Sequence, residues 1–535
     1  MSNRIGRSSL VLASGTIVSR ILGFISAVFL ARILGLFGAG ADAFALANQL
    51  PNNVYVLVAG GVLSSVLVPQ IIKAGLHKDG GEAYINRLLT LAGVAVGAIT
   101  LLSIAAAPLL VRLYTNQSTA SGGFGEENVS LATAFAFWCL PQIFFYAIYS
   151  VVGEVLNARG VFGPFTWTPA LNNVVVIAGM FWFSAEFEGN VASANDWSQL
   201  DIAILAGTAT LGVVLQAVAL FLFLGRAEIR YRPDFRFRGV GLGNTTRLTA
   251  WTFGMLLVTQ LAGIVQSNIA SIATATNDPG LAVLRFGWLV FMLPHSVITV
   301  SLGTTYFTRI SKDVVAKRFD AVGNDLRKAI LGISMFMAVS SVLLWLSSGY
   351  VGVVFGDGTL SGLSPVISLY AICLVAFGII FITQRVLYAF EDTRSPFYLQ
   401  LIQSTIFVAG IVLVSAGPAS NIATGIAAWL SVTTIMQALL ILFVLRKRLG
   451  KLGGRLLLIS FLKFVIALIP AAAVGFALKT ALDAWGADGP VEAIVSAGLV
   501  AIAVAFVYFP VLMLLRERSA LDLLTPFRKI ASVRD

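Results

Sequence analysis

An arginine lies inside a stretch of the chain that is otherwise apolar enough to cross a lipid bilayer. The stretch is VLASGTIVSRILGFISAVFLA (11–31), and Arg20 is near its middle. If the span begins near residue 9, Arg20 lies roughly 16 Å along the helix axis, close to the midplane of a ~30 Å hydrocarbon core. A guanidinium at this depth costs at least ~2.5 kcal/mol, so we expect Arg20 to face a polar cavity or an internal partner.

A second group of polar residues interrupts the next apolar stretch, around NQLPNNVY (48–55). Because proline has no amide hydrogen, Pro51 is expected to break or strain a helix there and to free backbone carbonyls. The residues beside it are polar: Asn48, Gln49, Asn52, Asn53 and Tyr55. This pattern predicts either a ligand or gating site, or a structural kink whose polar groups bond neighbouring helices.

Similar polar groups recur along both halves of the chain. They include LPQ (140–142), TPALNN (168–173), Gln260, Gln266, Asn268 and LPHS (293–296). Together they predict a hydrated interior in each half. Arg32, Arg285 and Lys463 lie nearer the ends of apolar stretches, where a long cationic side chain can reach the interface, so each is interpreted as either an anchor or a functional group.

The rest of the sequence does not support the chemistry of a soluble enzyme. It has two histidines, His77 and His295, and no metal-ligand cluster, phosphate-binding glycine loop, nucleophile elbow or Cys–His pair in a suitable context. Cys139 and Cys373 fall inside apolar runs and are interpreted as reduced packing residues. We therefore predict a protein that is not an enzyme and needs no cofactor.

The elements that must position these residues are membrane helices. The 535-residue chain is 58% hydrophobic and 11% charged, with a mean hydropathy of +0.90. Apolar runs of ~20 residues recur along it, which is the signature of a polytopic membrane protein, and each span should be helical. We predict about fourteen spans: 9–35, 42–72, 86–113, 130–157, 163–184, 201–225, 247–273, 280–308, 328–354, 363–390, 396–416, 421–445, 456–480 and 490–515.

The start MSNRIGR resembles the first part of a signal peptide, but no short apolar region with a cleavage site follows, so the first span is expected to remain.

The positions of the charges predict the topology. Most Lys and Arg residues fall at the N-terminus, in the even-numbered connections and in the C-terminal tail, whereas the connection 184–201 holds four acids and no basic residue. By the positive-inside rule both termini are cytoplasmic. The net charge of +11 therefore reports topology rather than a nucleic-acid partner. The cluster RAEIRYRPDFRFR (226–238) is interpreted either as a topological anchor or as a surface segment that touches anionic lipid.

A duplication organises the chain. VLNARGVFGPF (155–165) resembles VLYAFEDTRSPF (386–397), and the segment 69–93 has a weaker counterpart at 308–332. These pairs predict two six-helix lobes in the same orientation, related by a pseudo-twofold axis along the membrane normal, an arrangement found in transporters. The predicted parts are an N-terminal lobe (1–225), a basic cytoplasmic linker (226–246), a C-terminal lobe (247–448), helices 13 and 14 (449–516) and a cytoplasmic tail (517–535).

Several motifs resemble one known family. SRILGF (19–24), ADAFALANQLPN (41–52), LVPQ (67–70), LPHSVITVSLGT (293–304) and YAFEDTRSPF (388–397) are similar to the MviN/MurJ family, the lipid II flippases of the multidrug/oligosaccharidyl-lipid/polysaccharide exporter superfamily. The resemblance runs through all fourteen spans. It implies alternating access between two lobes, a cavity for the pyrophosphate, sugars and peptide of the lipid-linked precursor, and a groove at spans 13 and 14 for the polyprenyl tail. The membrane potential or an ion gradient would supply the energy.

The resemblance assigns roles to individual residues. Arg20 matches the family's first cavity arginine, whose guanidinium suits a pair of phosphate oxygens. The implied substrate-binding residues are Arg20, Ser26, Asn52, Asn53, Tyr55 and Arg285, and the implied gating or structural residues are Asp42, Pro51, Pro294, Asp392, Thr393, Arg394 and Pro396.

The chain departs from the family pattern at several charged positions. Ser26 stands at a second cavity arginine, and Ala27 follows where an aspartate is common. Tyr55 and Leu289 stand at other expected arginines, Gly60 stands at an expected acid, and Arg285 lies about one turn from Leu289. A cavity with fewer cations should hold a pyrophosphate less strongly.

The function predicted from these observations is a flippase that moves lipid II from the cytoplasmic to the outer leaflet of a bacterial inner membrane. Its expected partners are the lipid-linked peptidoglycan precursor, membrane lipids, a coupling ion and cell-wall synthesis proteins. The alternatives are a flippase for another polyprenyl-linked glycan, a small-molecule antiporter, and a non-transporting scaffold or regulator of cell-wall synthesis. An antiporter would need intramembrane carboxylates, and the candidates Asp42 and Glu154 lie near span ends.

Overall fold

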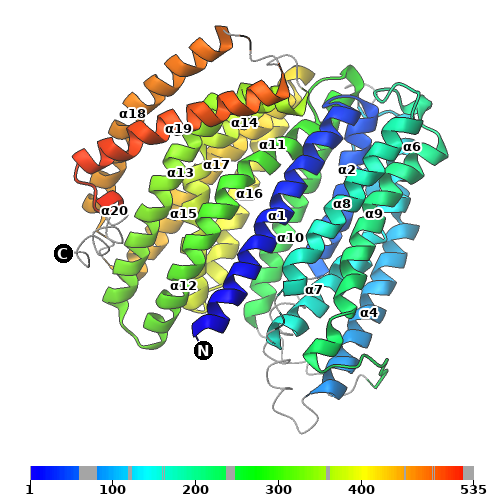
Figure 1. The fold of residues 1–535 in the computed structure, drawn as a ribbon, viewed down its shortest axis with the longest axis horizontal. Coiled ribbons are helices and arrows are strands. Elements are labelled where there is room, and N and C mark those ends of the chain that lie inside the picture. Colours follow the sequence, from blue (N-terminus) through cyan, green and yellow to red (C-terminus); the bar gives the residue numbers. More distant parts are fainter. Residues whose placement is uncertain are drawn as a thin grey trace. The chain divides into compact units, whose positions relative to one another are not determined.

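The computed structural model describes residues 2–58, 81–117, 123–159, 161, 163–236, 247–356, 362–450, 453–484, 486 and 489–521. Every regular element in these ranges is a helix (Figure 1), so the predicted all-helical fold is confirmed. The chain forms two compact units, Met1–Ala282 and Val283–Asp535, and each is described by itself. The limits of the two six-helix lobes and their pseudo-twofold symmetry stay predictions.

The first unit is a bundle of long helices. In chain order they are α1 (Ser2–Leu34), α2 (Ala39–Val58), α4 (Glu82–Ala105), α5 (Ala107–Tyr114), α6 (Glu126–Cys139), α7 (Gln142–Ala158), α8 (Gly163–Glu186), α9 (Gln199–Phe221), α10 (Arg247–Ala270) and the start of α11 (Leu281–Pro294), with short helices η3 (Ala194–Asp196), η4 (Leu224–Ala227) and η6 (Ser271–Thr276). α8 packs along both α1 and α9, and α2 packs against α6, α7 and α10. α1 and α2 are therefore held by several packed neighbours. These two helices carry most of the predicted site residues of this unit.

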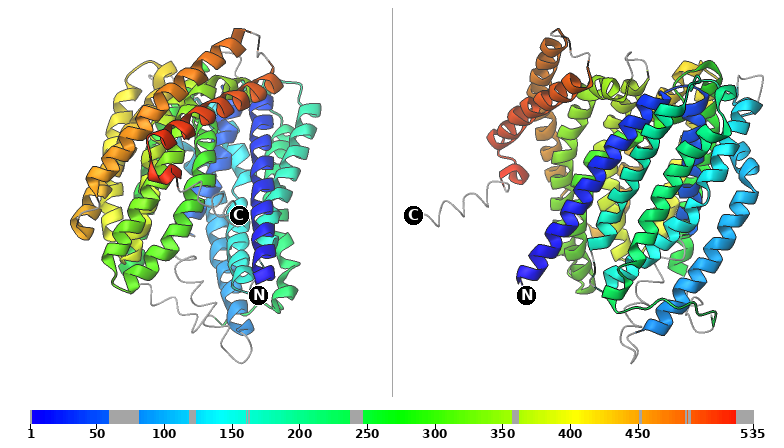
Figure 2. Two further views of the ribbon diagram at one scale, coloured as in Figure 1. Left: turned by 60° about the vertical axis from the view of Figure 1, so that its left-hand side comes forward. Right: turned by 45° about the vertical axis from the view of Figure 1, so that its right-hand side comes forward.

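The second unit is arranged around α13 (Phe319–Phe355). The other helices are the rest of α11, the π-helical turn η7 (His295–Thr299), α12 (Val300–Val315), α14 (Leu363–Ile372), α15 (Leu374–Ala389), α16 (Arg394–Ser415), η8 (Ala419–Asn421), α17 (Ile422–Leu449), α18 (Gly454–Ala484), α19 (Pro490–Leu514) and α20 (Arg518–Leu521). α13 packs against α12, α14, α15, α18 and α19. Figure 2 shows α18 and α19 lying side by side against it.

Local sequence signals set several helix ends. Ser198 and Asp201 form a capping box at the start of α9: the Ser198 hydroxyl accepts the Asp201 N–H at 3.2 Å, and the Asp201 carboxylate accepts the Ser198 N–H at 3.0 Å. Pro108 lies in the first turn of α5, directly after the chain leaves α4. Gly356 ends α13 with a φ of 89°, a conformation that favours glycine.

The observed helices match the predicted spans. Twelve described helices are long and apolar enough to cross a membrane, and the bent pair α14–α15 makes thirteen. The remaining predicted span, 42–72, begins as α2, and residues 59–72 lie outside the described residues. The spans predicted at 86–113 and 363–390 each consist of two helices, which meet near Ala106 and Cys373. The prediction of about fourteen helical spans therefore holds for the described part of the chain.

The distribution of side chains fits lipid as the solvent. Large apolar side chains point outward; Leu102 and Phe506, for example, are 69% and 79% exposed. Polar side chains lie between helices, where Gln403 of α16 donates to the Thr433 hydroxyl of α17 at 3.1 Å and Gln437 donates to Gln400 at 3.2 Å. Interhelical hydrogen bonds of this kind stabilise helix contacts in a solvent that offers no competing partner.

An ion pair with a buried carboxylate joins α18 to the turn that follows α19. The Glu517 side chain is 3% exposed, and its carboxylate contacts Lys463 Nζ at 3.4 Å and accepts the Ser460 hydroxyl at 3.0 Å. Lys463 Nζ also donates to the Arg516 carbonyl at 3.2 Å. These contacts give Lys463 a structural role in the protein, and the interface anchor or functional group that its position suggested stays a prediction.

We predict that Lys463→Met destabilises the protein because it leaves the Glu517 carboxylate buried without its cation. Removing one partner of a buried pair costs about 3–5 kcal/mol, whereas replacing both partners by apolar residues is close to neutral. The midpoint of thermal unfolding in detergent should therefore fall by several degrees in K463M and recover in K463M/E517M. An unchanged midpoint in K463M would contradict this assignment.

Candidate functional site

Small residues on α1 allow α8 to approach closely beside Arg20. Gly15, Ser19 and Gly23 are four residues apart and share one face of the helix. A Cβ atom on Gly15 would lie 2.8 Å from an indole ring of α8, and one on Gly23 would lie 3.5 Å from the Asn173 amide. That amide donates to the Ser19 carbonyl at 3.0 Å. This small-residue packing fixes α1 against α8 at the residue directly before Arg20.

Arg20 lies at the border between the packed and the outward faces of α1. It is about 100° around the helix from Ser19, and its side chain is half-buried. Ile17 and Ile21, 58% and 55% exposed, form the outward face beside it. Ser26 is buried, and Arg32 near the end of the helix is exposed. Of the predicted groups on α1, only Arg20 combines a charge with partial burial and a fixed backbone.

The polar segment of α2 does not break the helix. α2 is continuous from Ala39 to Val58 with Pro51 buried inside it, so the expected break is wrong and a single missing amide is tolerated. Asn53 donates to the Tyr114 hydroxyl at 3.4 Å, and the Tyr55 ring lies 5.9 Å from the ring of Tyr146. Asn52 is exposed. The second half of α2 thus uses part of its polar surface to contact α5 and α7.

The polar residues of α7 form hydrogen bonds to three neighbouring helices. Gln142 donates to the Thr210 hydroxyl of α9 at 2.9 Å and to Asn48 of α2 at 3.5 Å. The side-chain amide oxygen of Gln142 accepts the Tyr146 hydroxyl at 3.1 Å. Tyr149 donates to the Phe165 carbonyl of α8 at 2.7 Å. Gln142 and Asn173, two of the polar groups predicted to line a hydrated interior, bond helix to helix, and the hydrated interior stays a prediction.

The same holds at the end of α10. Asn268 donates to the Thr115 carbonyl at 2.8 Å, and the Asn116 N–H donates to the Ser271 hydroxyl at 2.8 Å. These two bonds join α10 and η6 to the end of α5.

Asp42 joins three segments of the first unit. Its side chain has no exposed surface, its carboxylate accepts the Thr274 hydroxyl at 2.6 Å and the Ala282 N–H at 2.8 Å, and the second bond places it at the start of α11. Gly280 is required beside it, because a Cβ atom there would lie 2.8 Å from Asp42 Oδ2. The carboxylate therefore holds the first turn of α2 to η6 and to the first turn of α11, where the helix dipole also favours a negative charge.

Two other predicted residues lie on α11, in the second unit. Arg285 is half-buried. Pro294 ends the regular α-helix, and the π-helical turn η7 follows it. Within this turn His295 is buried, with its ring 4.6 Å from that of Phe377. A proline next to a π-helical turn marks an irregular segment of span 8, the kind of distortion that is frequent at functional sites.

The DTRSP segment forms a clasp between α16 and α17. Asp392 accepts the Ser395 N–H at 2.9 Å and its hydroxyl at 2.7 Å, and Arg448 at the end of α17 donates to it at 2.6 Å. Burial alone would raise the pKa of Asp392, but the hydrogen bonds from Ser395 and the Arg448 guanidinium outweigh it and hold that pKa below its usual range. Asp392 therefore has the contacts of a structural residue.

The other three residues of this segment lie in the same turn. Thr393 is the N-cap residue of α16, and Pro396 is buried in the first turn of that helix. The Arg394 guanidinium lies 5.5 Å from the Tyr398 ring. These contacts shape the start of α16.

Sequence analysis missed several residues that the structure brings into these contacts. Thr274 and Gly280 have no local signal that would link them to Asp42. Arg385 was detectable as a charge inside an apolar run; its guanidinium lies 4.2 Å from the Phe381 ring and 5.5 Å from the Phe307 ring. Within the described residues, no group of three or more His, Cys, Asp or Glu is placed to hold a metal ion.

Comparison with known proteins shows the family. The family model described as lipid II flippase MurJ matches residues 30–490. A probable lipid II flippase MurJ of Vibrio cholerae is 25% identical, with 97% of each chain covered. A probable lipid II flippase MurJ of Thermotoga maritima is 25% identical over 75% of this chain and 78% of that one.

Solved structures show the fold. A lipid II flippase MurJ in an inward closed conformation has a TM-score of 0.65 at 19% identity. The match covers 94% of this chain and 100% of that one. An inward-facing multidrug resistance MATE family transporter has a TM-score of 0.63 at 16% identity, covering 83% of this chain and 99% of that one. The candidate membrane spans make this chain a multi-pass membrane protein, and these two structures share its fold. Because the family model spans most of its length, the chain belongs to the lipid II flippase MurJ family.

We predict that Asp42→Ala destabilises the first unit, because it leaves the Thr274 hydroxyl and the Ala282 N–H buried without an acceptor. Each unsatisfied group costs about 1–3 kcal/mol. The thermal midpoint in detergent should fall clearly in D42A and less in D42N, which keeps one acceptor oxygen. Thr274→Ser is the matched control, since it keeps the hydroxyl. If D42A and T274S melted alike, this role of Asp42 would be wrong.

We also predict that Asn173→Ala loosens α1 without removing any charge. The lost hydrogen bond contributes about 0.5–1.5 kcal/mol, so hydrogen exchange of the backbone amides around Arg20 should speed up about two- to tenfold. Asn195→Ala, in the exposed loop before α9, is the control for a general effect of removing an asparagine amide. Unchanged exchange in N173A would contradict the role of Asn173.

Proposed function

We propose that this chain moves lipid II from the cytoplasmic to the outer leaflet of a bacterial inner membrane by alternating access. The observation that carries the proposal is the family match over residues 30–490. The alignment to the Vibrio cholerae relative, whose printed name is probable lipid II flippase, extends over 97% of both chains. The structural likeness to a lipid II flippase over 94% of this chain supports the same architecture.

Arg20 is the residue to which we assign the phosphate of the substrate. Its half-buried position and the fixed backbone of α1 support this role, because a guanidinium held in place loses little freedom when it binds an anion. Arg20 precedes the segment that the family model matches. Its proposed role therefore rests on the small-residue packing of α1 against α8 and on the SRILGF resemblance. Asn52 and Tyr55 on α2 and Arg285 on α11 are the proposed polar contacts for the head group, and Ser26, Asn53 and Pro294 complete the proposed set.

The proposed orientation places both termini in the cytoplasm. The distribution of Lys and Arg supports it, as does the acidic connection 184–201, which then faces outward. A coupling ion and cell-wall synthesis proteins belong to the proposal as further partners.

A small-molecule antiporter is the second candidate, because the MATE-type fold supports it. Such a transporter would use intramembrane carboxylates to couple an ion. The Asp42 carboxylate already accepts hydrogen bonds from Thr274 and Ala282, and Glu154 is half-buried on α7. This use of Asp42 favours the flippase.

We predict that Arg20→Ala lowers flipping strongly, because it removes the guanidinium to which we assign the substrate phosphate, while the small-residue face of α1 and the Asn173 bond still hold the helix backbone. A charge-assisted hydrogen bond contributes about 1.5–3 kcal/mol, so the flipping rate should fall roughly 10- to 100-fold. The measurement is surface-exposed lipid II in a bacterium depleted of its own flippase and supplied with this chain.

Arg32→Ala is the matched control, an exposed arginine on the same helix, and it should flip at the wild-type rate. Equal rates for the wild type and R20A would remove Arg20 from the mechanism but keep the flippase. Failure of the wild type itself, with the protein present in the membrane, would favour another polyprenyl-linked glycan or a scaffold role in cell-wall synthesis.

A further inference from the structure

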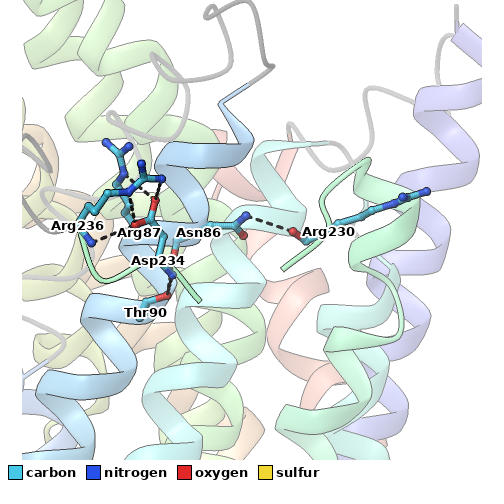
Figure 3. A network of polar contacts seen from close by, with 6 residues as sticks. All are labelled: Asn86, Arg87, Thr90, Arg230, Asp234 and Arg236. Atoms are coloured by element: carbon cyan, nitrogen blue, oxygen red, sulfur yellow. Dashed lines mark hydrogen bonds and ion pairs between the residues drawn. The ribbon is translucent and has the colours of Figure 1, made fainter. Parts of the chain in front are cut away.

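A short segment that contains no helix crosses the start of α4. This strap, residues 230–236, follows η4 and is bonded to α4 along the first turns of that helix (Figure 3). The Arg230 N–H donates to the Glu82 carboxylate at 3.1 Å, and the Arg230 carbonyl accepts the Asn86 amide at 3.2 Å. The Asp234 N–H donates to the Thr90 hydroxyl at 3.0 Å. The strap is therefore held mainly through its backbone.

One carboxylate completes this attachment. Asp234 accepts Arg87 Nε at 3.0 Å and the Arg236 backbone N–H and guanidinium at 2.9–3.0 Å. The hydrogen bonds from Arg236, and then the one from Arg87, hold the pKa of Asp234 well below its usual range. The carboxylate thus stays ionised throughout the neutral pH range, and the strap stays attached there.

The outward side of the strap is cationic and partly apolar. Arg226, Arg230 and Arg232 are exposed, and among the residues that the structure describes they form no ion pair. Figure 3 shows the Arg230 side chain pointing away from Asn86, while its backbone makes the contact. Phe235 in the strap is 66% exposed, and Leu222 at the end of α9 is 80% exposed. Exposed guanidinium groups beside exposed apolar groups fit a surface that is anionic at its head groups and apolar beneath them.

The place of the strap in the chain puts this surface at the membrane boundary. The candidate span Gln199–Ala227 ends directly before it, and the candidate span Glu82–Ala105 begins at the residues to which it is bonded. The strap therefore crosses the ends of two spans on one side of the membrane. The exposed acid Glu228 lies next to η4 and offsets only part of the charge of the three arginines.

We propose that the strap, with Leu222 and Arg226, is a binding surface for the phosphate head groups of anionic membrane phospholipids. Arg226, Arg230 and Arg232 contact the phosphates, and Leu222 and Phe235 enter the adjoining apolar layer. Guanidinium groups suit this ligand because they bind phosphate oxygens in a bidentate manner. The attachment at Asp234 holds the arginines at the head-group level, so the surface acts as a unit and not as a loose basic loop. The inference stands independently of lipid II transport.

The first test measures the apparent dissociation constant of short-chain phosphatidylglycerol for the full-length protein in detergent by native mass spectrometry. R226Q/R230Q/R232Q removes three guanidinium groups but none of the bonds that hold the strap, since Arg230 is attached through its backbone. Each arginine near an anionic surface contributes a factor of about five, so phosphatidylglycerol should bind on the order of 100-fold more weakly. Retention of phosphatidylcholine should not change.

The matched control is K312Q/K317Q/K328Q, which removes three exposed cations: Lys312 on the last turn of α12, Lys317 in the connection that follows, and Lys328 on α13. It should change phosphatidylglycerol binding less than threefold. Equal weakening in both triple variants would reduce the effect to bulk charge and overturn the proposal, as would wild-type binding by the strap variant. One-for-one displacement of phosphatidylglycerol by lipid II would make the surface a substrate site and overturn it too.

Asp234→Asn separates an attached surface from simple charge attraction. This variant makes the protein more positive, so charge attraction alone predicts equal or tighter binding of phosphatidylglycerol. Our proposal predicts weaker binding, by about tenfold, because the strap loses the carboxylate that holds it to Arg87. Tighter binding in D234N would contradict the proposal.

Discussion

The carboxylate of Asp42 is the constraint on which the arrangement of the first unit depends. A buried carboxylate needs hydrogen-bond donors, and here the Thr274 hydroxyl and the Ala282 N–H donate to it from segments far along the chain. The bonds require α2, η6 and the start of α11 to meet at one point, and they require glycine at 280. On its other side the start of α2 receives the loop before α9, where the Gly40 N–H donates to the Val191 carbonyl at 3.1 Å. The first turn of α2 is therefore fixed on two sides, and the polar residues lie on the second half of the same helix.

The same need for hydrogen-bond partners explains why many polar side chains of the predicted spans bond neighbouring helices. In lipid an unpaired amide or hydroxyl has no solvent to bond, so Gln142, Asn173 and Asn268 bond to neighbouring helices. Arg20 differs from these amides, because it is a charge beside an outward helix face and its neighbour Ser19 supplies the contact that fixes the backbone. The strap shows the reverse arrangement at Arg230, whose backbone bonds α4 while its side chain faces outward. In both places the backbone is fixed beside guanidinium groups that we propose bind an anion.

The sequence predicted the helices well, because a span of ~20 apolar residues is a local signal that one sequence carries. It predicted less about contacts: Asn173 bonds a carbonyl 154 residues away, and Thr274 bonds a carboxylate 232 residues away, and neither pairing leaves a periodic pattern. The sequence predicted that Pro51 would break or strain α2, but the helix runs without a break through this buried proline. The roles of Arg20, Asn52, Tyr55 and Arg285 stay predictions, because each depends on the substrate that contacts it.

We propose that this chain transports lipid II and that Arg20 takes part. The most direct measurement is the initial rate at which labelled lipid II crosses the membrane of vesicles that contain the purified full-length chain, under an imposed membrane potential. We predict movement above that of protein-free vesicles for the wild type and a rate at least about tenfold lower for Arg20→Ala. A wild-type rate equal to that of protein-free vesicles at every imposed potential would contradict it.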